Sequence, residues 1–271
     1  LIIYAVSTSQ SAGKMFLAGM VPGALLGILL IGMVYFTAKI KKFPRSESAS
    51  VKEIWAAFKD AFSGLLLVVI VLGGIYGGVF TPTEAAAISA VYAFFISVVV
   101  EKTIGLPQLP KVILSAANTS SMILYIITNA ILFSFLLTSE QIPQELALWV
   151  VENELSPYMF LLALNILLLV AGQFMEPSAI ILILAPLALP IALQLGIDPV
   201  HLGIIMTINM EIGMITPPVG LNLFVASHIS RMGMTKVAIA AFPWAIAMIG
   251  FLFLITFVPE ISLWLPNLVY E

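Results

Sequence analysis

The chain has 271 residues, of which 61% are hydrophobic and 9% are charged, and its formal net charge is −3. Soluble globular proteins carry about 25% charged residues. This composition, with a mean hydropathy of +1.14, therefore excludes a soluble enzyme and predicts a membrane protein. The sequence has no cysteine and two histidines, so it lacks the residues for disulfides or for a Cys/His metal cluster.

Apolar runs long enough to cross about 30 Å of hydrocarbon occur in the first half of the chain. They cover residues 15–38, 62–80, 84–100 and 118–138. Further apolar runs are short or interrupted by Pro, Gly or Glu, and they cover residues 157–173, 178–194, 200–215, 219–230 and 236–258. We therefore expect an all-α, polytopic transmembrane protein with irregular backbone at membrane depth in its second half.

The segments between these runs carry local signals of their own. In residues 51–62, Trp55 and Phe58 lie opposite Lys52 and Lys59 at helical spacing, which predicts a helix on the membrane surface; an exposed loop helix is the alternative. Residues 142–152 show a weaker version of this pattern. The glycines of residues 73–78 predict close helix packing, and Thr83 with the following Glu predicts a helix cap.

Basic residues predict the orientation, because Lys and Arg concentrate in the cytoplasmic loops of membrane proteins. Suppose that residues 157–194 form a re-entrant hairpin that enters and leaves from the outer side. Every Lys and Arg except Lys14 then falls inside, Arg45 included, and the C-terminal Glu271 falls outside. A full span in place of the hairpin would put Arg231 and Lys236 outside, so the rule favours the hairpin.

Irregular backbone in a bilayer must be buried in protein or line a wet cavity, because lipid offers no hydrogen-bond partners. Two segments predict such backbone. The first is the tip of the hairpin, residues 172–178, where Pro177 would start the second helix. The second is residues 211–222, where we expect one half-helix to end at Ile215 and the next to begin near Pro218. A simple proline kink is the alternative reading of this second segment.

Such a pair of elements suits ion and anion binding. Unwound carbonyls at a helix C-terminus favour a sodium ion, and a helix N-terminus favours an anionic group. Glu176 and Glu211 are the carboxylates that we place inside the membrane, and each has helix capping or pairing across the hairpin as an equal alternative to ion handling. Asn165 and Asn209 line a pathway or bond a neighbouring helix. His201 is expected at the surface.

Three long motifs occur in order along the chain. They are GGIYGGVFTPTEAAA at residues 73–87, FMEPSA at residues 174–179 and GMITPPVGLNLFV at residues 213–225. Together they resemble the large membrane subunit of tripartite ATP-independent periplasmic (TRAP) transporters, and the wording around Glu176, Glu211 and Asn222 is most similar to the C4-dicarboxylate branch.

The resemblance implies an ion-transporter fold of two inverted repeats, each with a re-entrant hairpin and a broken helix, that works as a sodium-coupled elevator in the bacterial inner membrane. It implies a periplasmic C-terminus, no enzymatic activity, no nucleic-acid partner and no cofactor apart from sodium as the coupling ion. The implied partners are membrane lipid, a small four-helix membrane subunit, a periplasmic substrate-binding protein and an organic acid anion.

Carried over to this chain, the resemblance also assigns site residues. The sodium site would use Gly172, Gln173, Glu176, Gly213, Ile215 and Thr216. Substrate contacts would come from Ser178, Thr216, Pro217, Pro218, Val219, Gly220 and Asn222.

The same resemblance divides the chain into six parts. They are the tail of the first repeat (1–38), a cytoplasmic loop with the surface helix (39–62), scaffold spans of the second repeat (63–138), an outer interfacial helix (139–156), the hairpin and broken helix (157–234), and the last span with the C-terminus (235–271). The sequence begins at Leu1 without an initiator Met. Ala5, Ser9 and Pro22 stand at the same spacing as Ala226, Ser230 and Pro243, so the first residues are similar to the end of the broken helix. We therefore expect the first repeat's hairpin to be absent from this chain.

Two other functions remain open. The chain could belong to a stand-alone sodium/dicarboxylate symporter, which needs no binding protein, or to a structural membrane subunit that transports nothing. An intramembrane enzyme would need a nucleophile with a base or paired acids on facing helices, and the sequence shows no such pair.

Overall fold

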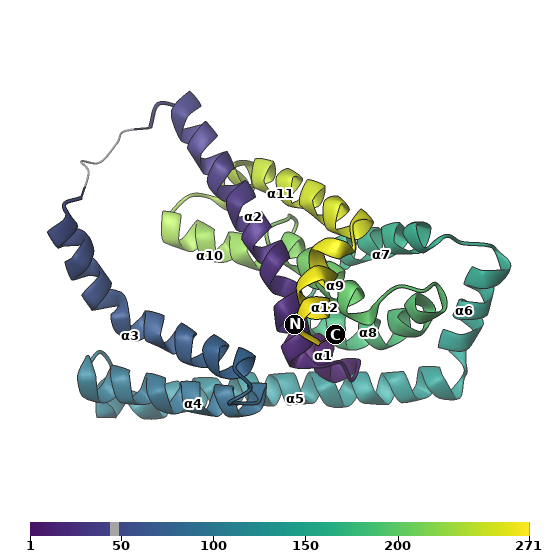
Figure 1. Ribbon diagram of the computed structural model, residues 1–271, viewed down its shortest axis with the longest axis horizontal. Helices are drawn as coiled ribbons and strands as arrows, with labels where there is room; N and C mark the ends of the chain where they lie inside the picture. The colour runs from purple at the N-terminus through teal and green to yellow at the C-terminus, as the bar shows by residue number, and fades with distance from the viewer. Residues whose placement is uncertain (44–48, 271) are drawn as a thin grey trace. The chain divides into compact units, whose positions relative to one another are not determined.

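The computed structural model describes residues 1–43 and 49–270, in which helices are joined by short loops and no strand occurs (Figure 1). The chain divides into two compact units. The first unit combines Leu1–Tyr35 with Ile123–Glu271, and the second is Phe36–Met122. Arg45 and Glu271, which entered the orientation prediction, lie outside the described residues.

The first unit holds the hairpin and the broken helix. Its helices are α1 (Ile2–Ser7), most of α2 (Ala12–Ile40), the second half of α5 (Leu109–Ser139), α6 (Ile142–Glu152), α7 (Pro157–Gly172), α8 (Pro177–Gln194), α9 (Pro199–Met214), α10 (Leu221–Ser230), α11 (Met234–Phe257) and α12 (Glu260–Tyr270). The second unit holds the rest of α2 and α5 with α3 (Val51–Tyr76), α4 (Pro82–Phe95), the π-helix η1 (Ile96–Val100) and the 3₁₀ turn η2 (Leu106–Gln108).

Six helices of the described ranges are long and apolar enough to cross a membrane. They are α2, α3, α4 continued by η1, α5 with the turn before it, α8 and α11. Five of them, α2, α3, α4 with η1, α5 and α11, overlap predicted apolar runs, although α3 and α5 begin about ten residues earlier than predicted. Helix α8 was predicted as the second helix of a re-entrant hairpin and not as a span, and the re-entrant course of this hairpin stays a prediction. The first helix of the hairpin, α7, has 16 residues, which corresponds to about 24 Å and falls short of the hydrocarbon thickness.

The core of the first unit is built around α9, which packs against α7, α8, α10, α11 and α12 (Figure 1). This helix is buried along nearly its whole length. At its start, the Tyr4 hydroxyl donates a 2.6 Å hydrogen bond to the Pro199 carbonyl. Gly203 makes room for this contact, because a Cβ at that position would lie 2.5 Å from Tyr4 and from Met15.

Several local predictions need correction. Residues 51–62 were expected as a separate surface helix, whereas they form the first part of one continuous helix, α3, which begins at a capping box of Ser50 and Glu53. The cap of α4 is Thr81 and not Thr83, because the Thr81 side chain bonds the backbone of Glu84. Helix α12 was not predicted. In the glycine-rich segment, the Phe80 ring of the following turn lies directly against Gly74, whereas a Cβ on Gly73 or Gly78 would meet nothing within 4 Å. The predicted close packing between helices at this segment therefore stays a prediction.

Candidate functional site

The hairpin tip joins α7 to α8 through residues 173–176, and a side chain of the tip caps the start of α8. Glu176 precedes a proline, which disfavours helical backbone, and it adopts an extended conformation (φ −68°, ψ 133°) as the N-cap of α8. Its carboxylate accepts hydrogen bonds from the Ala179 N–H (3.1 Å) and the Ser178 hydroxyl (2.7 Å). Of the two readings of Glu176 left open by the sequence, the structure therefore displays the helix cap.

The break between α9 and α10 arises from two missing donors. In a continuing helix, the Gly213 and Met214 carbonyls would accept from residues 217 and 218, but both of these are prolines and have no N–H. Helix α9 ends at Met214, and the Gly213 carbonyl instead accepts the Thr216 N–H at 3.1 Å.

The end of α9 agrees with the predicted end to within one residue, but the predicted start of the next half-helix was wrong. Helix α10 begins at Leu221 and not near Pro218. The Pro217–Pro218 peptide bond is cis and belongs to the loop. Gly220, with a φ of +52°, is the N-cap, because this left-handed conformation turns the chain into the helix at little steric cost for a glycine.

The C-terminal ends of α7 and α9 meet backbone to backbone. A Cβ built on Gly213 would lie 2.7 Å from the Cα, carbonyl carbon and carbonyl oxygen of Gly172. A Cβ on Gly172 would lie 3.3 Å from the Gly213 Cα. Glycine is therefore required at position 213, and a Cβ at position 172 would make a tight contact. The hairpin and the broken helix are in direct contact at this point.

This junction concentrates oxygen atoms and negative partial charge. Each helix C-terminus carries about half a negative elementary charge from carbonyls that lack intrahelical partners. Within the described residues, the Gly172 carbonyl accepts no hydrogen bond. The Thr216 hydroxyl donates to the Ile212 carbonyl at 2.6 Å, which leaves its own lone pairs for another partner. Oxygen ligands beside two negative helix ends suit a hard monovalent cation.

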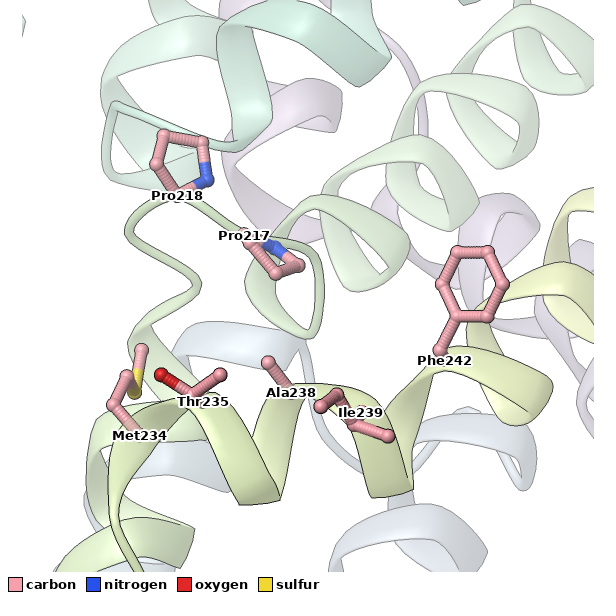
Figure 2. Close-up of a pocket in the computed structure, with 7 residues that line it drawn as sticks. All are labelled: Pro217, Pro218, Met234, Thr235, Ala238, Ile239 and Phe242. Atoms are coloured by element: carbon pink, nitrogen blue, oxygen red, sulfur yellow. The ribbon is translucent and has the colours of Figure 1, made fainter.

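Pro217 and Pro218 form one wall of an apolar groove of about 420 Å³. Figure 2 shows the opposite wall, where side chains of α11 line the groove below the loop that carries the two prolines. Those residues are Met234, Thr235, Ala238, Ile239 and Phe242. This groove can exclude water and limit the shape of the ligand that fits, but it supplies few groups that bind a carboxylate.

The start of α10 offers the donors that the groove lacks. Ser156, Glu176 and Asp198 cap α7, α8 and α9 with their side chains, whereas α10 begins at Gly220 without a side-chain cap. The Leu223 N–H donates to the Gly220 carbonyl at 2.7 Å, so within the described residues the N–H groups of Leu221 and Asn222 are the ones open to an acceptor from outside the helix. Asn222 is exposed in the first turn, and Val219 is half-buried just before it. Of the predicted substrate residues, Ser178 lies apart from this loop, at the hairpin tip.

Comparison with known proteins shows the family of the chain. A family model described as the DctM component of the tripartite ATP-independent periplasmic transporter matches residues 1–261. The chain belongs to this family. The C4-dicarboxylate TRAP transporter large permease protein DctM of Rhodobacter capsulatus is 57% identical over 96% of the chain, and its counterpart in Pseudomonas aeruginosa is 54% identical over 98%. The sialic acid TRAP transporter large permease protein SiaM of Vibrio cholerae is 37% identical over 99%.

The chain spans less than two thirds of these relatives. The matched regions make up 59% of the Rhodobacter protein, 62% of the Pseudomonas protein and 63% of the Vibrio protein. The chain therefore corresponds to part of each of these longer relatives.

In this DctM-family chain the structure also corrects the position of one polar residue and shows the partner of two others. His201 was expected at the surface, and this was wrong: its side chain is 2% exposed, and its Nδ1 lies 2.7 Å from the Ser262 hydroxyl of α12. The partner could not be foreseen because α12 was not predicted. Asn165 and Asn209 bond one another in the core, whereas Glu211 lies on the exposed side of α9.

Proposed function

We propose that this chain is the sodium- and substrate-binding half of a secondary transporter subunit that imports a small organic acid anion. The observation that carries the proposal is the contact between Gly172 and Gly213, which brings two helix C-termini together backbone to backbone. Membership of the DctM family supports a transport role. The names of the two most identical relatives described above point to a C4-dicarboxylate as the anion.

Sodium would bind at this junction. The ligands would be carbonyl oxygens of Gly172, Gly213 and the turn that follows, with the Thr216 hydroxyl as a side-chain ligand. Glu176 and Gln173 would support the sodium site mainly by fixing the backbone of the hairpin tip. Glu176 caps α8, and the Gln173 amide donates to the Leu169 carbonyl at 3.0 Å.

The anion would bind on the other side of the break. One carboxylate would accept hydrogen bonds from the uncapped N–H groups at the start of α10, and the amide of Asn222 lies in the same turn. Pro217 and Pro218 would form the apolar wall that keeps water from the ligand. A dicarboxylate has a second charged end, and we assign that end to parts of the subunit outside this chain.

Coupling would follow from the shared segment between the two sites. Residues 215–220 leave α9 at the sodium junction and enter α10 at the anion site, so sodium binding would order the turn that the anion needs. In the elevator model, hairpin and broken helix move as one body, which fits the close packing of α7 on α9. A periplasmic binding protein would deliver the anion, and a small four-helix subunit would complete the membrane complex.

Uptake of radiolabelled succinate into proteoliposomes tests this function. The liposomes would contain the complete large subunit with its small subunit, with and without the periplasmic binding protein. We expect uptake that requires both a sodium gradient and the binding protein. Uptake that persists without the binding protein would identify a stand-alone symporter, and a folded complex without any uptake would favour a structural role.

Thr216→Val tests the sodium ligand directly, because valine keeps the shape of threonine and lacks the hydroxyl. We expect the half-saturating sodium concentration to rise about 5- to 20-fold, as the loss of one polar contact predicts. Thr216→Ser keeps the hydroxyl and is the matched control. An unchanged sodium dependence in the valine variant would remove Thr216 from the site.

A further inference from the structure

Helix α9 carries two buried polar side chains in a core that is otherwise mostly apolar. Asn209 stands four residues before Gly213, and His201 stands eight residues before Asn209, so the three share one ridge of the helix. Asn209 is 0% exposed. Most other buried residues of α9 are Leu, Ile, Val or Met. A fully buried amide one turn before the sodium junction therefore stands out from its surroundings.

Asn209 belongs to a hydrogen-bonded chain that joins three helices. Its Nδ2 donates to the Asn165 Oδ1 of α7 at 2.8 Å, and also to the Ile205 carbonyl of its own helix at 2.9 Å. The Asn165 Nδ2 donates to the Thr256 hydroxyl of α11 at 3.0 Å. That hydroxyl donates in turn to the Leu252 carbonyl at 2.8 Å. Asn165 is 1% exposed and Thr256 is 0% exposed, so the chain runs through the interior.

The acceptor end of this chain is open. Within the described residues, the Asn209 Oδ1 is buried and accepts no hydrogen bond. A buried acceptor without a partner costs about 1–3 kcal/mol, so an apolar side chain at this position would stabilise the packing better. Packing alone does not explain why position 209 is an asparagine. Its directional hydrogen bond to α7 indicates a structural role.

That role is to fix the position of α7 along α9, which is the register of the two helices. In lipid, apolar helix surfaces gain little from one mutual position over another, and interhelical hydrogen bonds define which position is occupied. The backbone carbonyl oxygen of Asn209 would lie 3.8 Å from a Cβ on Gly172, so α7 packs against this turn of α9. The amide link to Asn165 lies one turn before Gly213 in α9 and about two turns before Gly172 in α7, on the same pair of helices. A slip of α7 along α9 would separate the two glycines.

We propose that Asn209 is a positioning residue for the sodium site. Together with Asn165 and Thr256 it holds α7 and α11 against α9, and so it holds the Gly172 and Gly213 backbones at the spacing that a bound sodium requires. The inference rests on the proposed function. It adds a specific cause for the geometry of the junction, through residues that need not touch the ion.

Sodium titrations of succinate uptake by the complete complex test this role in Asn209→Leu, Asn165→Leu and the double variant. Leucine has a similar volume and makes no hydrogen bond. We expect each single variant to raise the half-saturating sodium concentration about tenfold, as outer-shell changes at metal sites do. The double variant should be no worse than either single variant, because both remove the same link. Thr207→Val is the matched control, since the Thr207 hydroxyl bonds only the Gly203 carbonyl of its own helix.

The outcomes separate the inference from the function on which it rests. A wild-type complex whose uptake ignores sodium would overturn the proposed function. Sodium-dependent wild-type uptake, with a lower maximal rate but an unchanged half-saturating sodium concentration in Asn209→Leu, would overturn the positioning role and leave a structural one. If the leucine variants do not fold, Thr256→Val removes the far end of the chain with little change of shape. It should raise the half-saturating concentration about threefold, and an unchanged value would also contradict the inference.

Discussion

The hairpin tip and the helix break are two interruptions of the same unit, and they handle their free backbone groups differently. At the tip, one carboxylate caps α8 through Ala179 and also binds the neighbouring Ser178 hydroxyl. At the break, two prolines remove donors from α9, and a glycine without a side chain precedes α10. The tip is closed by its own side chains, whereas the break leaves both a carbonyl end and an N–H end open.

This contrast suggests a division of labour. A capped tip is a rigid support that presents the Gly172 backbone, and an open break is the place where ligands complete the structure. Substitutions that separate support from binding should therefore change uptake, ligand requirement and stability differently at the two places.

Gly213→Ala should have the largest effect, because its Cβ would lie 2.7 Å from backbone atoms of Gly172 that cannot move aside cheaply. We expect sodium-dependent uptake to be lost and the free energy of unfolding to fall by about 1–3 kcal/mol, as overpacking predicts. Uptake assays and thermal unfolding in detergent measure both. Gly250→Ala is the control, since a Cβ there meets nothing within 4 Å in α11. Equal behaviour of the two variants would refute the close contact.

Replacing Pro217 and Pro218 together by alanine should reduce the number of backbone carbonyls that lack a partner at the end of α9. Alanine restores the N–H groups that can bond the Gly213 and Met214 carbonyls, so α9 can extend. We expect at least a tenfold loss of uptake, with slower hydrogen exchange in residues 215–219. Pro243→Ala, inside α11, is the comparison for a proline that does not end its helix. Unchanged exchange in residues 215–219 would show that the prolines do not cause the break.

Gly220→Ala should have an intermediate effect. Its backbone has a φ of +52°, and an added Cβ would lie 2.9 Å from the Thr216 carbonyl oxygen. A left-handed conformation costs alanine roughly 1–2 kcal/mol, so we expect a raised half-saturating succinate concentration and lower stability. Gly196→Ala also has a positive φ, of +72°, but open space around it, and it separates conformational strain from crowding. If both variants raise the succinate requirement equally, crowding at the break has no role.

Glu176→Ala should have the smallest effect on ion binding, because the carboxylate serves as a cap. Loss of an N-cap lowers the free energy of unfolding by about 0.5–2 kcal/mol, which thermal unfolding would detect. Glu176→Gln keeps an acceptor for the Ala179 N–H and should unfold near the wild-type temperature. A sodium dependence that shifts more than about threefold in the glutamine variant would make Glu176 an ion ligand and not only a support.

The amino-acid sequence by itself predicted most of the helices and the two places where they are interrupted, although it missed α12. Runs of apolar residues specify the membrane helices because lipid leaves a backbone no other hydrogen-bond partners. Pro177, Pro217 and Pro218 specify where helices stop or start because they lack an N–H group. These local causes act within a few residues, so the hairpin and the end of α9 could be predicted. The start of α10 could not, because Gly220 adopts either backbone hand and its neighbours decide which.

Only the tertiary structure decided which distant residues meet. Gly172 and Gly213 are 41 positions apart, and Asn165, Asn209 and Thr256 come from three helices. Their contacts depend on how α7, α9 and α11 pack, and no local pattern encodes that register. His201 shows the same limit: its sequence neighbours indicated an exposed helix start, and its burial depends on α12, which packs over it from the far end of the chain.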